Sequence, residues 1–340
     1  MSLLAQIKAS NAQLTEATTP RTAVFIGTTD GIGKSALAAL VSHGFPLKAY
    51  IIGRDQARDQ SLLAELYTIN NKIEIVYLKG QISLMSEVVR LTSYILEKEK
   101  KIDLLFHSAG FLPLLGRQET DEGLEMTTAV AYFSRLAFIL RLLPRLQAAA
   151  ESGDTQYAPR IISILGAGNE SLDLFLNDLS LKEPGHFSVP IYARHVATMV
   201  TLSMKRLAEE PGNEKIVFIH AHLGRVSTDL VKKSWGDRWD GAVPPAAAPS
   251  AMSLSQWTPE EAGEKALYLM TSAEYGGKGV NMTDGRSAGL TVTHQVGGSL
   301  FSVSDVMKPL QQDTLLAGLE DIGAPNTIQD YSVKTLAPWL

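Results

Sequence analysis

The stretch Thr22–Gly33, with the sequence TAVFIGTTDGIG, decides the fold. Its first half, Thr22–Gly27, is a run of β-branched and aromatic residues of the kind that forms a buried strand. Glycines follow directly, and the next stretch, Lys34–Val41, is rich in alanine and leucine, which favour a helix. The sequence therefore predicts a buried strand, a glycine-rich turn and a helix in succession.

The same alternation continues along the chain. Short, continuously apolar runs predict further strands at Leu47–Gly53, Lys72–Leu78, Ile102–His107, Arg160–Leu165 and Lys215–Ala221. Segments of helical composition lie between and after them, at Asp55–Asn70, Leu84–Lys100, Thr120–Glu151, Pro190–Glu210 and Pro259–Thr271. Strands of this kind, alternating with helices, indicate a parallel sheet covered on both faces. We therefore expect an α/β fold with a doubly wound parallel sheet, whose short seventh strand is Gly279–Met282.

Composition narrows the class of protein. The chain has 340 residues, of which 45% are hydrophobic, and its 31 basic and 36 acidic residues leave a net charge of −5. An acidic chain lacks the basic surface of a nucleic-acid binder, so no nucleic-acid partner is expected. It contains no cysteine, which excludes disulfides and thiolate chemistry. No signal-peptide pattern and no apolar run of about 20 residues is present, so we expect a cytoplasmic protein without a membrane partner.

Three segments depart from the regular alternation, namely Gly166–Val189, Val231–Trp257 and Arg286–Leu340. Long insertions of this kind tend to be lids or binding loops. We therefore predict one domain over residues 21–285, with a substrate lid at about 231–257. An N-terminal extension covers 1–20, and a C-terminal extension over 286–340 is expected to pack on the same domain.

The glycine-rich turn predicts a dinucleotide site. Such a turn lets the backbone approach a pyrophosphate, and the following helix N-terminus supplies N–H groups and a positive dipole end. The predicted ligand residues of the turn are Gly27, Thr29, Asp30, Gly31, Ile32 and Gly33. A plain strand-to-helix connection is the alternative for any glycine-rich turn.

Arg54 indicates which dinucleotide is bound. An arginine directly after the second strand favours the 2′-phosphate of NADP(H), whereas NAD enzymes usually place a carboxylate there. Asp30 and Asp55 oppose this prediction, because acidic groups near a phosphate are unfavourable. The alternative is that Arg54 is a solvated loop residue.

At this point the chain resembles the short-chain dehydrogenase/reductase family, whose sheet is of the Rossmann type. The resemblance covers about Thr22 to Gly285 and rests on three motifs. Gly27–Gly33 resembles Thr-Gly-x-x-x-Gly-Ile-Gly, His107–Gly110 resembles Asn-Asn-Ala-Gly, and Leu223–Thr228 resembles Pro-Gly-x-x-x-Thr. It also implies a homodimer or homotetramer.

The resemblance assigns further cofactor contacts by position. It places Ser108, Ala109 and Gly110 on the adenosine side and Thr228 at the nicotinamide end. Gln81 lies where an aspartate commonly meets the adenine, and an amide can hydrogen-bond the same edge.

The catalytic pattern of the family is degenerate here. The family uses a tyrosine as proton donor, a lysine four residues later, a serine after the fifth strand and an asparagine on the long helix. Tyr192 matches the tyrosine, but Val196, Gly166 and Ala131 fall at the other three positions.

Two further residues are candidates for the missing functions. His195 is the nearest ionisable residue that can relay a proton near neutral pH. Arg135, on the long helix, is a candidate for holding an anionic or enolate oxygen, with a surface cation as the alternative. Glu170 is either an acid/base group or a loop cap, and the spacing of His220 and His222 gives little support for a metal site.

The leading hypothesis is an NADP(H)-dependent reductase acting on the carbonyl or imine of a bulky, mostly apolar natural-product intermediate. Trp235, Trp239 and Trp257 in the predicted lid suit such a ligand, with packing onto the core as an equal alternative. The pattern is similar to atypical family members of fungal secondary metabolism in the runs Ser108–Pro113, Gly116–Thr120, Gly168–Glu170 and Ala193–His195. The runner-up is a non-redox cyclase or isomerase on the same scaffold, and the third reading is a non-catalytic partner.

Overall fold

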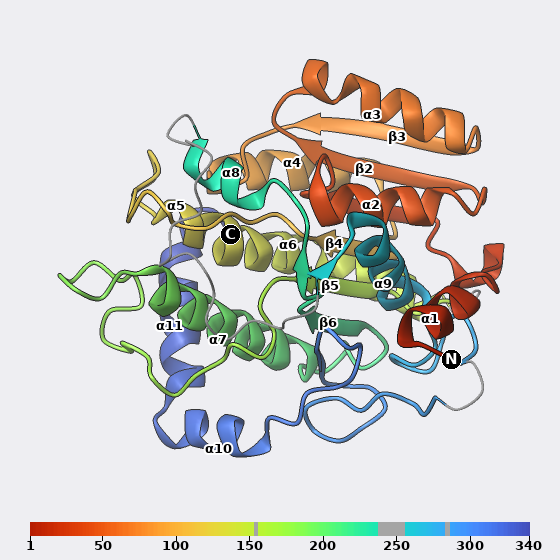
Figure 1. Cartoon of the computed structure of the whole chain (residues 1–340). Coiled ribbons are helices and arrows are strands. Elements are labelled where there is room, and N and C mark those ends of the chain that lie inside the picture. The colour runs from red at the N-terminus through yellow and green to blue at the C-terminus, as the bar shows by residue number, and fades with distance from the viewer. Residues whose placement is uncertain (153–155, 237–255, 283–285) are drawn as a thin grey trace.

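The computed structural model describes residues 1–152, 156–236, 256–282 and 286–340. Its centre is a seven-stranded parallel sheet, shown in Figure 1. In spatial order the strands are β3 (Ile73–Lys79), β2 (Leu47–Gly53), β1 (Thr22–Ile26), β4 (Leu104–His107), β5 (Arg160–Ile164), β6 (Val217–Ala221) and β9 (Leu300–Val303). The chain order reverses beside β1, which therefore lies at the switch point where doubly wound sheets bind ligands.

Burial of both faces explains why these strands are continuously apolar. Phe25 of β1 pairs with Ile51 of β2 on one side and with Phe106 of β4 on the other, and all three are fully buried. With no face left for water, a polar residue in these strands would lose hydration on both sides of the sheet. The expected doubly wound α/β sheet is confirmed.

Helices form a layer on each face of the sheet. One layer contains α2 (Gly31–Val41), α3 (Gln56–Ile69) and α9 (Pro259–Thr271), with α1 (Leu3–Asn11) packed against α9 (Figure 1). The other contains α4 (Met85–Lys98), α6 (Ser134–Glu151) and α7 (Val189–Ala208). The N-terminal residues are thus part of the packed molecule, and the Asn11 side-chain amide donates to Glu264.

The long helical passage Met126–Glu151 is continuous but irregular. It begins with α5 (Met126–Thr128), passes through a π-helical turn over Ala129–Phe133, and continues as α6, which contains Pro144. By length and mean hydropathy of 1.4 it is apolar enough to cross a membrane, but 83% of its apolar window is buried inside the protein. Its hydrophobicity is accounted for by its place in the core.

The C-terminal segment packs against this second layer. Helices α10 (Asp313–Asp321) and α11 (Ala324–Leu336) lie at the opposite side of the molecule from α3, and α11 packs on α7 (Figure 1). The buried Tyr132 hydroxyl joins them, because it hydrogen-bonds Ser203 of α7 at 2.8 Å and Ser332 of α11 at 2.5 Å. The segment 286–340 therefore adds both a strand and two helices to the domain.

The prediction of a seventh strand at Gly279–Met282 is wrong. The strand beside β6 is β9, and Val280 makes a single isolated bridge with Ser272. The backbone of Val280 donates to Thr271 and accepts from Ala273, so it is held against the end of α9 and does not reach the edge of the sheet.

Candidate active site

The glycine-rich turn packs tightly on the end of β4. Gly27 has a φ of +82°, and a Cβ there would overlap the backbone of Ala109. A Cβ on Gly33 would overlap the carbonyl oxygen of Gly27, to which the Ser108 hydroxyl donates at 3.0 Å. Only glycine fits at positions 27 and 33, because the turn, the first residues of α2 and the end of β4 are in direct backbone contact.

The same turn has the features of a pyrophosphate cradle. Asp30 is the N-cap of α2, and its carboxylate accepts from the Gly31 N–H at 2.6 Å. Beside it the Thr28 hydroxyl is fully buried and has no hydrogen-bond partner among the described residues. An unpartnered buried hydroxyl at a helix N-terminus fits a phosphate ligand. Thr28 was missed by the sequence analysis, which selected Thr29 and the glycines.

The corner after β2 is rich in cations. Arg54 is exposed there, and Arg58 of α3 approaches the Asp30 carboxylate at 3.8 Å. Asp55 faces its own helix, because its carboxylate accepts from the Ala57 N–H at 3.0 Å as the N-cap of α3. The acidic residue that argued against a phosphate at this corner is therefore engaged in capping.

The remaining adenosine-side candidates divide into two groups. Gln81 donates its amide N–H to Ser83 at 3.0 Å, which leaves its carbonyl oxygen as an acceptor. A Cβ on Gly110 would meet only Leu165, at 3.9 Å. By contrast, Ser108 supports the Gly27 carbonyl, and the Ala109 carbonyl accepts from Arg135. Ser108 and Ala109 thus make hydrogen bonds that hold the turn together. Gln81 has a carbonyl oxygen that can accept a hydrogen bond, and Gly110 has open space beside its Cα.

Thr228 and α8 (Leu230–Trp235) lie across the turn. The Thr228 methyl group is 3.4 Å from where a Cβ on Gly31 would stand, and Lys233 forms an ion pair with Asp30. Figure 1 shows α8 on the side towards which the strands point. Most of the predicted lid, including Trp239, lies outside the described residues.

Tyr192 is buried at the start of α7. Its hydroxyl donates to the carbonyl of Thr127 at 3.2 Å, and burial, the largest cause, raises its pKa above the usual value. Val196 is also buried, so no cation occupies the position of the family's lysine. The more distant charge of Arg135 lowers the Tyr192 pKa, but by less than burial raises it.

Arg135 is neither a surface cation nor an open anion ligand. It is 2% exposed, and burial lowers its pKa to about 9. Its guanidinium makes five hydrogen bonds of 2.6–3.1 Å, to the carbonyls of Ala131, His107, Ala109 and Ile164 and to the hydroxyl of Ser163. These partners are all neutral, and together they fasten the carboxyl ends of β4 and β5 to the long helix.

His195 supports a loop in the described structure. Its Nε2 accepts from the Phe175 N–H at 3.1 Å, which assigns the proton of the neutral ring to Nδ1. The Phe175 ring stacks on His195 with centroids 5.8 Å apart. Burial, with a smaller contribution from Arg194, lowers the His195 pKa to about 4. No hydrogen bond joins His195 to Tyr192 among the described residues, so the geometry does not favour the predicted relay.

Beyond β5 a chain of hydrogen bonds leads away from the vacant serine position. The Gly166 N–H donates to His220 Nε2 at 3.3 Å, and His220 Nδ1 meets the Thr201 hydroxyl at 2.8 Å. Thr201 donates to Glu170 at 2.6 Å, and Gln312 of the C-terminal segment donates to the same carboxylate at 2.7 Å. The sequence analysis predicted Glu170 to be either an acid/base group or a loop cap. Neither prediction included its hydrogen-bond partners Thr201 and Gln312. In the described part of the chain no cluster of His, Asp or Glu has the arrangement of a metal site.

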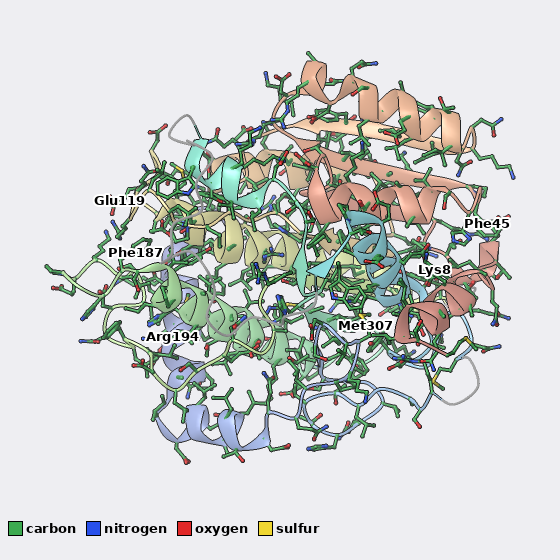
Figure 2. The ribbon with its side chains drawn as sticks, in the orientation of Figure 1. Lys8, Phe45, Glu119, Phe187, Arg194 and Met307 are labelled. Atoms are coloured by element: carbon green, nitrogen blue, oxygen red, sulfur yellow. The ribbon has the colours of Figure 1, made fainter. Side chains whose placement is uncertain are left out.

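The loop that follows β5 reaches a second polar segment. Figure 2 shows Phe187 and Glu119 on the same side of the molecule. Lys182 pairs with Glu119 at 3.3 Å, and Arg117 donates to the carbonyl of Ser180 at 3.3 Å. Loop 166–188 is therefore fastened both to α7 and to the segment after β4.

Two cavities differ in their relation to these residues. One of about 20 Å³ is lined by Leu112, Thr127 and Ser234, and so lies next to the carbonyl that Tyr192 contacts. A larger one, of about 240 Å³, is lined by Tyr157, Lys215 and Gly276 and lies at the opposite, amino-terminal edge of the sheet. Only the smaller cavity borders the candidate site.

The pH dependence of folding tests the role of His195. Its pKa is about 4 in the folded protein and near 6.5 in an unfolded chain. Unfolding between these values takes up a proton, so stability falls as the pH drops from 6.5 towards 4. His195→Gln keeps an acceptor for Phe175 and removes the titration. We expect a shallower pH dependence in urea denaturation, by up to about 1.4 kcal/mol per pH unit.

A second buried histidine, His220, maintains part of the pH dependence of stability in His195→Gln. Burial lowers the His220 pKa to about 3, so its own proton uptake on unfolding persists when His195 is replaced. An equal slope for the wild type and His195→Gln would contradict the buried, neutral state of His195.

Comparison with known proteins agrees with this architecture. The family model for short chain dehydrogenases matches residues 21–155. "Oxidoreductase AN1596" from Emericella nidulans is 33% identical over 97% of this chain and 96% of its own length. "Short-chain dehydrogenase/reductase SAT2" from Stachybotrys chartarum is 29% identical over 80% of this chain and 78% of its own.

Solved structures share the fold at low identity. The NADPH-bound carbonyl reductase from chicken fatty liver has a TM-score of 0.54 and 17% identity, covering 86% of this chain and 99% of its own. The NADH-dependent reductase A1-R′ has a TM-score of 0.53 and 20% identity, over 77% and 94% of the two chains. These likenesses concern the fold alone, and of these two reductases one is NADPH-bound and the other NADH-dependent.

Proposed function

Because the chain belongs to the short-chain dehydrogenase family, we propose that it is an NADP(H)-dependent oxidoreductase that reduces a carbonyl or imine of a bulky natural-product intermediate. One observation carries the proposal, namely the turn at the switch point of the sheet. There the positive φ angles of Gly27 and Gly31 combine with the buried hydroxyl of Thr28, which has no partner in the described part of the chain, at the N-terminus of α2. The names of the fungal relatives, which include "oxidoreductase", support the same class of reaction.

The residues of the turn and its neighbours account for cofactor binding. The N–H groups at the start of α2 and the Thr28 hydroxyl would hold the pyrophosphate. Gln81 offers its free carbonyl oxygen to the adenine, and the exposed Arg54 offers a guanidinium to the 2′-phosphate. When bound, the nicotinamide supplies the hydride, and the protein supplies position and a proton.

Tyr192 is the proposed proton donor. Its raised pKa keeps the phenol protonated at neutral pH, so a proton is available to the carbonyl oxygen, which takes up the electron pair of the C=O π bond as the hydride adds to the carbon. The phenolate that remains lacks a neighbouring lysine, because Val196 stands there, and it recovers a proton from water. A small cavity lined by Thr127, whose carbonyl accepts from the Tyr192 hydroxyl, supports a substrate approach from this side.

The two described tryptophans of the predicted lid share one feature. Trp235 and Trp257 each have a buried indole N–H without a partner among the described residues, which suits a hydrogen bond to a ligand. Trp257 also packs against a cation, since Lys265 lies 3.9 Å from the centre of its ring. Both tryptophans therefore support a bulky substrate.

Turnover tests the reaction class directly. We expect reduction of bulky ketones or imines to depend on added NADPH after bound nucleotide has been removed. Full turnover of a substrate without nucleotide would instead identify a cyclase or isomerase on this scaffold and reject the oxidoreductase proposal.

Cofactor selectivity tests the role of Arg54. Arg54→Ala removes the guanidinium that would meet the 2′-phosphate, so we expect the Kd for NADPH to rise about tenfold or more while that for NADH is unchanged. Fluorescence titration of both nucleotides measures the difference.

Arg21→Ala is the matched control, because Arg21 is also exposed but precedes β1 at the far end of the strand. Equal losses for NADPH and NADH in Arg54→Ala would count against a 2′-phosphate contact.

A further inference from the structure

We propose that Lys233, on α8, is a phosphate ligand for the dinucleotide, and that Asp30 both positions it and competes with the phosphate for it. The inference rests on the proposed function and adds to it a residue from outside the glycine-rich turn. Its structural basis is the ion pair that Lys233 forms with Asp30 at the N-terminus of α2.

The position of Asp30 presents an electrostatic problem. Its carboxylate caps α2 through the Gly31 N–H, at the end of the helix where the pyrophosphate of a dinucleotide is expected. A carboxylate at this point repels a phosphate. A protein that binds a dinucleotide here therefore needs cations to offset the charge of Asp30.

Two cations meet this one carboxylate. Lys233 approaches it from α8 and Arg58 approaches it from α3, at 3.8 Å. Together with Asp30 they leave one excess positive charge, to which the helix dipole adds. Lys34 does not contribute in the same way, because it pairs with Glu65 at 3.2 Å. The corner is thus complementary to an anion although it contains an acid.

The backbone around Lys233 is held in place by contacts on both sides of the switch point. The neighbouring Ser234 hydroxyl accepts from the Leu112 N–H at 2.9 Å, which ties α8 to the segment after β4. Earlier in the chain, the Thr228 methyl group packs against Gly31. Lys233 therefore lies between the two segments that flank a dinucleotide, with an ammonium that can move from a carboxylate to a neighbouring phosphate.

The environment of Lys233 favours that exchange. Its side chain is 39% exposed, so a ligand can reach the ammonium. The pyrophosphate of a dinucleotide carries two negative charges against one on the carboxylate, and it offers more acceptor oxygens, so it is the stronger partner for the ammonium. Lys232, the adjacent residue, is exposed and forms no ion pair among the described residues.

Binding of NADPH separates the roles of these residues. For Lys233→Met we expect the Kd, measured by fluorescence titration, to rise about tenfold, as for the loss of one charge-assisted contact. For Asp30→Asn we expect the Kd to fall several-fold, because asparagine still caps the helix but neither repels the phosphate nor retains the lysine. Lys232→Met is the matched control and should bind as the wild type does.

Salt dependence provides a second readout. The slope of log Kd against log salt concentration should be shallower for Lys233→Met than for the wild type, and Lys233→Arg should restore both slope and affinity. Circular dichroism melting confirms that each variant is folded.

The outcomes distinguish this inference from the proposed function. A wild-type protein that fails to bind NADPH overturns both. A wild type that binds while Lys233→Met binds equally well, or more tightly, overturns the role of Lys233 and leaves the oxidoreductase proposal intact. Unchanged or weaker binding by Asp30→Asn overturns the competition between Asp30 and the phosphate.

Discussion

Replacement of Arg135 by methionine is expected to lower the free energy of unfolding by on the order of 3 kcal/mol. The guanidinium donates to five buried oxygens at the ends of β4 and β5 and on the long helix. Methionine fills a similar length but donates nothing, so these acceptors lose their partner in a region that water does not reach. Urea denaturation at pH 7 measures the change.

Arg135→Lys distinguishes the effect of the hydrogen-bond donors on stability from the effect of the positive charge. Lysine retains the positive charge but has three N–H groups on one nitrogen, so it cannot reach all five oxygens, and we expect an intermediate stability. If Arg135→Met were as stable as the wild type and only its turnover were lost, Arg135 would be catalytic and its structural role would be refuted.

Tyr192→Phe is expected to lower kcat about a hundredfold, with little change in KM. Phenylalanine keeps the ring in its buried place and removes only the hydroxyl that contacts Thr127. The loss of one neutral hydrogen bond costs about 1 kcal/mol of stability, too little to unfold the protein. Steady-state kinetics with NADPH and a bulky ketone that the wild type reduces provide the measurement.

A second tyrosine controls for nonspecific effects. Tyr94 is 41% exposed on α4, and Tyr94→Phe should leave kcat unchanged. Wild-type kcat in Tyr192→Phe would show that water or another group delivers the proton, and that Tyr192 serves packing alone.

The sheet could be predicted from the sequence as far as β6 because each of those strands is a distinct, continuously apolar run within the alternation of strands and helices. β9 could not, because Leu300–Val303 is a four-residue run after two glycines in a segment without that alternation. The prediction at Gly279–Met282 identified a buried residue, Val280, but burial alone does not indicate which strand edge a residue joins.

The candidate site was predictable where neighbours in sequence are neighbours in space. The glycine-rich turn is local, and its geometry followed from its spacing. Arg135 was not placed correctly because its acceptors at His107 and Ile164 meet only when β4 and β5 pair. One signal was present, since Arg135 is the one charged residue between Met126 and Leu140 and must find partners if it is buried.

His195 shows the opposite limitation. It is three residues from Tyr192, yet its ring binds the Phe175 N–H, and sequence proximity did not reveal that direction. The ion pair between Asp30 and Lys233 joins the first turn to a helix near the other end of the domain, so no local pattern indicates it.

The packing of α11 on α7 has a consequence for the order in which the chain is made. A ribosome releases α6 and α7 long before α11, and until then the face that Ile328 and Leu336 later cover stays open. Nascent chains with such open apolar faces adhere to one another or to chaperones. Translation that stops ahead of Ala324 therefore yields a fragment whose apolar face is uncovered and prone to aggregation, and α11 is the element that covers this face.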